Sequence, residues 1–295
     1  MTGWQRSNNR KLYNRLVSLL PRLRDTAKLN QIEIVSCTPN SAANVHLEYV
    51  PLEEALKKSA ERVPSHLGHE VLHAEHARMC RWMRDTVPSG DGLLTGADAN
   101  QEWLLPWWYE NVRKHNECPV AFADFGLSPE LRAWCSERGL VLEVPEVPGL
   151  TWHKKPFAIL ASPFKRTVWL DADCEVRGEL GVVFPYADKG IGLTLDPHSK
   201  TCRQPGALAT GVVACAHGEP GIEEWCKEIL LCQYRGDQEA FDAIRDRLSA
   251  RVTVMPRGFQ WLRLDEENED VLVMHWTGGI GKRQIQIKDQ LPALA

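Results

Sequence analysis

Hydrophobic and polar residues beyond position 90 alternate in blocks that are typical of an α/β protein. Short apolar segments of strand length are separated by longer segments with helical spacing. The apolar segments are "GLLTGAD", "PVAFADF", "LVLEV", residues 166–171, "GIGLTL", "TGVVACA", "VTVMP" and "VLVMHW". The helical segments are 101–115, 128–139, 153–162, 220–232 and 237–249. This order predicts a parallel α/β sheet, with a nucleotide-sized crevice at the carboxyl ends of its strands.

The first 90 residues have a different pattern. They are mostly of helical type, with one strand candidate at "QIEIVSC". The sequence "PSGDG" at 88–92 then marks a break by its proline, glycine and aspartate content. We therefore expect a mainly helical N-terminal extension over 1–90, whose role the sequence does not indicate, and an α/β domain over 91–295.

The charge of the chain is uneven. The formal net charge is −4, but residues 1–90 hold 13 Lys/Arg against 9 Asp/Glu, so the remainder has a net charge of −8. An acidic body does not attract polyanions, which argues against general nucleic-acid binding. It is compatible with the binding of a metal cation.

Cysteine use and hydropathy bear on the cellular setting. The nine cysteines include no CxxC pair, so we expect reduced thiols and a cytoplasmic protein. No apolar run approaches the roughly 18 residues of a membrane span. Residues 6–28 are basic and carry leucines at helical spacing. This segment either makes weak contact with an anionic membrane surface or, as we favour, packs on its own domain with a solvated basic face.

The segment "VWLDADC" at 168–174 carries the first chemical signal. Asp171 and Asp173 follow a buried strand, and the period of two places them on the same side. Two carboxylates so close repel each other unless a cation lies between them. Carboxylate oxygens suit Mg²⁺ or Mn²⁺, and such a metal typically bridges a diphosphate. The alternative is a strand-to-turn transition with solvated acids.

The segment "HWTGGIGKR" at 275–283 follows the last apolar strand. His275 offers an imidazole to a metal that carboxylates already hold. Gly278 and Gly279 permit close approach of the backbone and offer N–H groups to phosphate oxygens, and Lys282 adds a positive charge. We expect residues 277–284 to form a loop that is open without nucleotide and closes over a diphosphate. The alternative is an ordinary glycine-rich surface turn.

Two further segments contain candidates. In "YRGDQEAF", Asp237 can cap the following helix, which is the plainer interpretation of this residue, and Gln238 would then lie in the first turn. In "TWHKKPFAIL", one lysine of the pair Lys154 and Lys155 is expected to reach the same phosphates, and a solvated lysine pair is the alternative.

The segment "KKPFAILASPFKRTVWLDADCEV" resembles the central part of GT-A-fold glycosyltransferases. It is most similar to the retaining galactosyltransferase/glycogenin group and to fungal alpha-mannosyltransferases, and "TGVVAC", "GDQEAF" and "HWTGGIGK" follow in that group's order. The resemblance covers about residues 91–290 and implies the GT-A, Rossmann-like fold with a mixed, mostly parallel sheet. The sequence departs from the group in its closing motif, where the group has lysine six residues after histidine, followed by Pro-Trp. Here Lys282 lies seven residues after His275, and Arg283 follows it.

The resemblance implies a role for each candidate residue. The metal ligands are Asp171, Asp173 and His275; the diphosphate contacts are Lys155 and Lys282; the residues flanking the anomeric carbon are Asp237 and Gln238; and the nucleoside is lined by Thr95, Gly96 and Ala97. It also implies a metal-dependent enzyme, using Mn²⁺ or Mg²⁺, that moves a sugar from a UDP- or GDP-sugar to an acceptor hydroxyl with retention. The acceptor, whether glycan, lipid-linked sugar, protein or small molecule, is not readable from the sequence.

Two other functions fit parts of the sequence. Residues 69–73 read "HEVLH", the pattern in which His69 and His73 bind zinc and Glu70 activates a water. The elongated form of that motif is absent, and a helix packed on the body is the plainer interpretation. A non-catalytic nucleotide-sugar-binding module is the second alternative, and the complete set of Asp171, Asp173 and His275 argues against it.

Overall fold

The computed structural model describes two units of the chain. The described residues are 20, 21, 24, 34–39, 41–55, 57, 89–145, 147, 150–199, 206–230, 234–266 and 268–290. Contacts between residues divide the chain into units 1–75 and 76–295. The domain boundary expected at 90/91 stays a prediction.

The described part of the first unit is small. It contains two short parallel strands, β1 (Val35–Ser36) and β2 (Glu48–Tyr49), joined through the 3-10 turn η1 (Ala42–Val45). Strand β1 falls inside the strand candidate "QIEIVSC", and residues 52–55 are helical. Most of the basic segment 6–28 and all of "HEVLH" at 69–73 lie outside the described residues, as does most of the extension expected to be helical.

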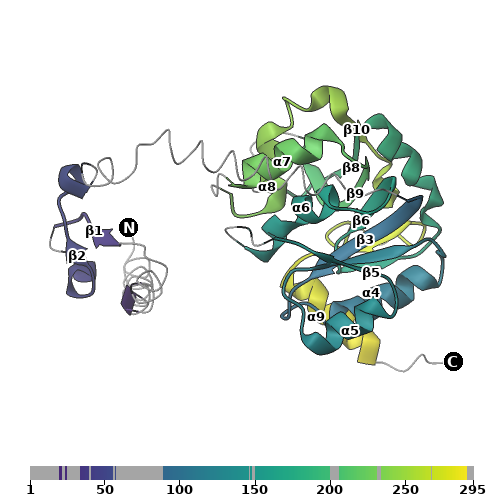
Figure 1. The fold of residues 1–295 in the computed structure, drawn as a ribbon, viewed down its shortest axis with the longest axis horizontal. Helices are drawn as coiled ribbons and strands as arrows, with labels where there is room; N and C mark the ends of the chain where they lie inside the picture. The colour runs from purple at the N-terminus through teal and green to yellow at the C-terminus, as the bar shows by residue number, and fades with distance from the viewer. Residues whose placement is uncertain are drawn as a thin grey trace. The chain divides into compact units, whose positions relative to one another are not determined.

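The second unit is built on a large mixed sheet (Figure 1). In spatial order its described strands are β10 (Val252–Val254), β8 (Ile191–Leu195), β9 (Leu208–Ala216), β6 (Arg166–Leu170), β3 (Asp91–Ala97), β4 (Val120–Asp124) and β5 (Leu140–Glu143). Neighbouring strands are parallel except for β9, which runs antiparallel to both β6 and β8. The predicted mixed, mostly parallel sheet is confirmed. The carboxyl ends of β3 and β6 and the amino end of β9 consequently meet at one edge.

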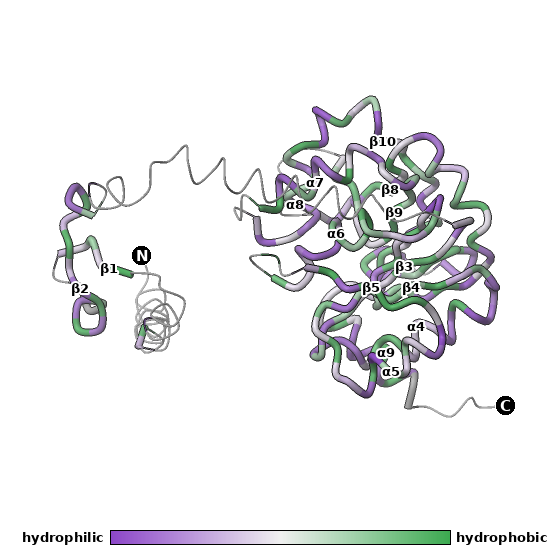
Figure 2. The backbone as a smooth tube through the Cα atoms, in the orientation of Figure 1, coloured by the Kyte–Doolittle hydropathy of each residue, from purple (hydrophilic) through white to green (hydrophobic). Residues whose placement is uncertain are grey.

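Helices cover both faces of this sheet. They are α4 (Leu104–Arg113), α5 (Pro129–Ser136), α6 (Lys155–Leu160), α7 (Pro220–Leu230), α8 (Asp237–Ile244) and α9 (Gly278–Gln290). One buried cluster lies under α6, α7 and α8, and the other lies under α4, α5 and α9 (Figure 1). In Figure 2 the central strands carry much of the hydrophobic colour, whereas the outer helices alternate in hydropathy. The sheet is therefore buried on both faces, as its continuous apolar strands require.

A second, small sheet positions the C-terminal candidate residues. It consists of β11 (Trp261–Leu262), β12 (Val273–His275) and β7 (Cys174–Val176), with β12 antiparallel to β7. The register places His275 opposite Cys174. Strand β7 follows the Asp171–Asp173 turn directly, so this pairing brings the end of β12 to the two aspartates.

Helix boundaries follow local sequence signals only in part. Ser128 caps α5, and its hydroxyl accepts from the N–H of Leu131 at 3.2 Å. Gly139, expected to end this helix, lies beyond it, and a Cβ there would approach the carbonyl oxygen of Val120 to 2.3 Å. The alternative interpretation of Asp237 as a helix cap is wrong, because Gly236 occupies the cap position of α8 and Asp237 is the first helical residue.

The glycine-rich segment after His275 is also different from the expectation. Residues 278–284 are not a loop but the beginning of α9, and Gly278 has a positive φ of 78°. Gly281 packs so closely that a Cβ would lie 1.8 Å from the carbonyl oxygen of Trp276. These glycines thus permit a tight turn from β12 into a helix. Within the described ranges, no helix combines the length and hydrophobicity that crossing a bilayer requires.

Candidate active site

A cavity of about 700 Å³ opens where the carboxyl ends of β3 and β6 meet the amino end of β9. Its volume is in the range of small-molecule sites. The predicted residues that line it are Gly96, Ala97, Lys155, Asp171, Asp173, Asp237, Gln238, His275, Gly278, Gly279 and Lys282. The fold therefore brings together segments from residue 96 to residue 282.

Thr95 is the exception among the predicted residues. Its side chain is fully buried in β3, and it is not part of the cavity lining. Successive residues of a strand face opposite sides of the sheet, so Gly96 lies on the other face. The side chain of Thr95 consequently does not reach a ligand in this cavity.

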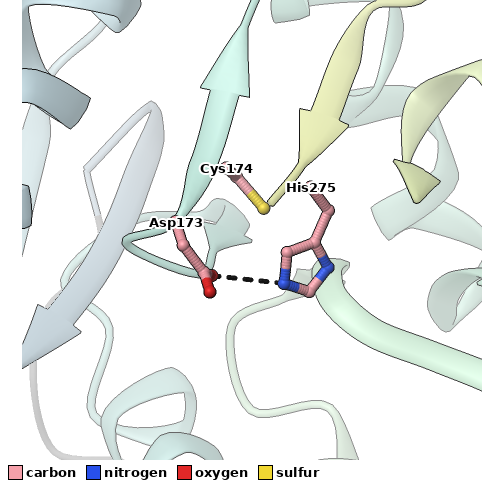
Figure 3. Close-up of side chains that lie close together, drawn as sticks. All are labelled: Asp173, Cys174 and His275. Atoms are coloured by element: carbon pink, nitrogen blue, oxygen red, sulfur yellow. Dashed lines mark ion pairs between the residues drawn. The ribbon is translucent and has the colours of Figure 1, made fainter. Parts of the chain in front are cut away.

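Asp173 and His275 form a close pair at the cavity wall, and Asp171 lies beside His275. The Nε2 atom of His275 lies 3.2 Å from Asp173 Oδ1 and 3.8 Å from Asp171 Oδ2. Figure 3 shows the Asp173 carboxylate and the His275 ring approaching each other from the turn before β7 and from the end of β12. Asp173 and His275 are both buried, at 6% and 8% exposure.

The electrostatics of this cluster favour an ionised carboxylate. Burial raises the pKa of Asp173, but His275 and Lys282 outweigh it and hold the pKa far below its usual range. Burial lowers the pKa of His275, but Asp173 and Asp171 outweigh it and raise the pKa above its usual value. The site is thus a compact arrangement of negative charge balanced by nearby cationic groups.

Cys174 lies beside this cluster, close enough for its sulfur to belong to the same ligand set. Burial is the largest of the effects that raise the pKa of its thiol well above the usual value. The thiol contacts the carbonyl oxygen of Gly211 with a sulfur–oxygen distance of 3.7 Å. Hard cations such as Mg²⁺ and Mn²⁺ prefer oxygen donors to a soft sulfur ligand, so for these metals Cys174 is suited to packing rather than to ligation.

The remaining donors fit a hard divalent cation. Two carboxylate oxygens, one from Asp171 and one from Asp173, face a single imidazole nitrogen at the wall of an open cavity. Oxygen-rich sets with one imidazole suit Mn²⁺ or Mg²⁺. Asp171, Asp173 and His275 are therefore the residues that would hold such a metal.

Lys155 is placed differently from the expectation. Its buried ammonium lies 2.9 Å from Asp171 Oδ1 and 2.7 Å from Asp237 Oδ2, and it donates to the carbonyl oxygen of Thr210 at 3.2 Å. An ammonium has three N–H donors, so these acceptors use all of them. In this arrangement Lys155 links Asp171 to Asp237 and presents no donor to a diphosphate.

Asp237 and Gln238 begin α8 and also line the cavity. The hydroxyl of Thr210 donates to Asp237 Oδ2 at 2.8 Å, the same oxygen that Lys155 contacts. Gln238 donates from Nε2 to Asp196 Oδ2 at 2.8 Å. A second cavity of about 380 Å³ includes Asp196 and shares Gln238 and His275 with the first. Gln238 therefore lies at the junction of the two cavities.

Gln260 is a site residue that the sequence did not reveal. It is 1% exposed; its Oε1 accepts from the N–H of Val212 at 2.8 Å, and its Nε2 lies 2.9 Å from Nδ1 of His275. These contacts orient the His275 ring. The available signal was Gly211, because glycine inside a strand often marks a close approach. A Cβ at Gly211 would lie 2.5 Å from His275 Nδ1 and 2.6 Å from Gln260 Nε2.

Sequence comparisons with known proteins give no match. No protein-family model matches the chain, and no curated protein matches it.

Solved structures do resemble it. Galactosyltransferase LgtC in complex with donor and acceptor sugar analogues is 15% identical, with a TM-score of 0.46 over 69% of this chain and 97% of that chain. Mouse xyloside xylosyltransferase 1 is 11% identical, with a TM-score of 0.45 over 65% and 98% of the two chains. The glycosyltransferase GlyE of Streptococcus pneumoniae TIGR4 is 14% identical, with a TM-score of 0.50 over 65% and 55%.

The likeness to GlyE agrees with the strand order and strand directions described above. The sheet is mostly parallel, its antiparallel strand β9 lies between β6 and β8, and the cavity lies at the carboxyl edge. The chain has the fold of the GT-A glycosyltransferases.

Proposed function

We propose that the chain is a glycosyltransferase that moves a sugar from a nucleotide-diphosphate-sugar donor to an acceptor hydroxyl. The observation that carries this proposal is the convergence of Asp171, Asp173, His275 and Lys282 on one cavity wall, beside the first turn of α9. A diphosphate is the ligand that such a wall suits, since it binds both a divalent cation and positive protein groups.

The first turn of α9 supplies the proposed diphosphate contacts. Gly278 and Gly279 line the cavity, and the first N–H groups of a helix have no partner within it. These N–H groups and the helix dipole favour an anion there. Lys282, one turn further, adds a full positive charge to the same wall. Gly96 and Ala97 at the end of β3 leave room for the nucleoside.

The proposed metal is Mn²⁺ or Mg²⁺, held by Asp171, Asp173 and His275. Its chemistry is to neutralise the charge that develops on the departing diphosphate as the glycosidic bond breaks. Lys155 forms ion pairs with both Asp171 and Asp237, so it holds the Asp171 carboxylate in position relative to Asp237.

The second cavity is the proposed entry for the acceptor. Gln238 lines both cavities, so a hydroxyl bound in the second cavity would meet the donor sugar near Asp237 and Gln238. We propose retention of the anomeric configuration, with the acceptor hydroxyl attacking on the face of the leaving group and passing its proton to a phosphate oxygen. No protein side chain is then required as a general base.

The transfer proposal is tested by a panel of UDP-, GDP-, ADP- and CDP-sugars with Mn²⁺. We expect one donor to be cleaved, with release of its nucleoside diphosphate, and cleavage to stop in EDTA and return with added metal. Binding of a nucleotide sugar without cleavage, with any acceptor offered, supports a binding module instead. Full turnover in EDTA contradicts the metal site alone.

Retention is tested separately on the product. Proton NMR of the new linkage is expected to show the anomeric configuration of the donor. An inverted product contradicts the proposed stereochemistry and leaves donor recognition standing.

A further inference from the structure

Lys282 occupies one oxygen of a carboxylate that belongs to the proposed metal site. Its ammonium donates to Asp173 Oδ2 at 2.6 Å, while Oδ1 of the same carboxylate faces His275. The Asp173 side chain is 8% exposed and that of Lys282 is 28% exposed. The contact is therefore a charge-assisted hydrogen bond at the cavity wall, shielded from solvent on one side.

An ammonium and a divalent cation compete for such a carboxylate. Both are positive, and like charges about 4 Å apart repel strongly wherever the surroundings are less polar than water. A metal that enters alone must either displace Lys282 from Asp173 or bind against its charge. Either outcome weakens the binding of the free metal.

A diphosphate changes this balance. Lys282 lines the same cavity as Gly278 and Gly279, and its flexible four-carbon stem permits its ammonium to move to another partner. Phosphate oxygens beside the first turn of α9 offer that partner. Asp173 Oδ2 is then released to the metal, so the two ligands assist each other.

We propose that Lys282 is a latch on Asp173 that a nucleoside diphosphate opens, so that the site takes up the cation and the diphosphate together and binds the cation alone weakly. This inference rests on the proposed function, because the diphosphate is the ligand of that function. Thermodynamic linkage requires the assistance to be reciprocal.

The first test measures Mn²⁺ alone by isothermal titration calorimetry. Lys282→Met removes the charge and keeps the aliphatic stem, and Arg283→Met removes the same charge from the adjacent, exposed position. We expect Lys282→Met to bind Mn²⁺ about tenfold more tightly than the wild type, the effect of one charge-assisted hydrogen bond. Arg283→Met should match the wild type, and Lys282→Arg should also bind the metal weakly.

The latch is overturned if folded Lys282→Met binds Mn²⁺ no more tightly than the wild type does. It is also overturned if neither protein binds Mn²⁺. An equal gain in Arg283→Met also overturns it, because the effect is then a general change of charge. Circular dichroism confirms that each variant is folded.

The second test repeats the titration with saturating UDP or GDP. We expect the nucleoside diphosphate to increase the Mn²⁺ affinity of the wild type and of Arg283→Met by a larger factor than that of Lys282→Met. If no nucleoside diphosphate binds to any variant, the release step and the proposed function fail together. If diphosphates bind but the factor is the same in all variants, the latch alone fails.

Discussion

Asp124 is the last residue of β4 and Asp173 lies three residues after β6, so both lie at the carboxyl edge of the same sheet, yet they have different kinds of partner. Asp124 Oδ1 accepts from the N–H groups of Gly126 and Leu127, each at 2.8 Å, and its Oδ2 accepts from Arg132 eight residues later. Among the described residues, the Asp173 carboxylate pairs with the side chains of His275 and Lys282, and Lys282 lies 109 positions later.

This difference separates a structural acid from a binding acid. The partners of Asp124 are mainly backbone N–H groups of its own turn, which cannot leave without unfolding that turn. The partners of Asp173 are side chains at a cavity wall, and a ligand can replace them. A position at the carboxyl end of a strand therefore does not decide the role of an acid, whereas the nature of its partners does.

The largest expected effect is that of Asp173→Asn. Loss of the charge removes a proposed metal ligand, so transfer should fall by about a thousandfold or more, as when a main electrostatic group of a site is lost. Turnover at saturating donor and Mn²⁺ measures this, with thermal unfolding to confirm the fold. Asp270→Asn is the matched control, since Asp270 is exposed and lies outside the cavity lining. If Asp173→Asn transfers sugar at the wild-type rate, then Asp173 has a structural role, as Asp124 does.

Lys155→Met sharpens the comparison on the side of stability. The substitution leaves the carboxylates of Asp171 and Asp237 without the buried ammonium that both contact. The free energy of unfolding should therefore fall by about 3–5 kcal/mol. Urea denaturation measures the loss, and Lys165→Met, at an exposed position, should change it little. Combination with Asp237→Asn is expected to cost less than the sum of the two single changes. Additive costs would mean that the Lys155–Asp237 contact is not energetically coupled.

Gln238→Ala concerns the junction of the two cavities. If Gln238 acts near the anomeric carbon, kcat should fall roughly ten- to a hundredfold while the KM for the donor changes little, as for an interaction used in the transition state. Steady-state kinetics with varied donor separate these quantities. A change in KM alone would make Gln238 a binding residue.

The smallest effect is expected for Asp124→Asn. Burial raises the pKa of Asp124, but the N–H groups of Leu127 and Gly126 and the guanidinium of Arg132 outweigh it and lower the pKa. A lowered folded-state pKa stabilises the fold above the unfolded value of about 3.9, and this contribution is lost as the pH falls through the folded pKa. We expect the variant to be about 1 kcal/mol less stable at pH 7, with the difference shrinking below about pH 4. A difference independent of pH would show that the charge of Asp124 contributes nothing.

Local sequence determined much of the scaffold and part of the site. Strands β3, β4, β6, β8 and β9 lie where the apolar segments predict them, and Ser128 caps its helix. Asp171 and Asp173 come directly after β6, as "VWLDADC" indicates. These features depend on side-chain period and on hydrogen bonds within a few residues, which the sequence displays directly.

Tertiary structure alone decided which side chains of the site contact each other. Lys154 and Lys155 are adjacent and chemically identical, but Lys154 donates to the carbonyl oxygen of Phe125, whereas Lys155 joins Asp171 to Asp237. The direction of each side chain depends on how its helix packs on the sheet. Likewise, the glycines after His275 are compatible with a loop or with a helix start, and packing against Trp276 selects the helix. Contacts between distant segments follow from the complete arrangement of the strands, and no short stretch of sequence contains that information.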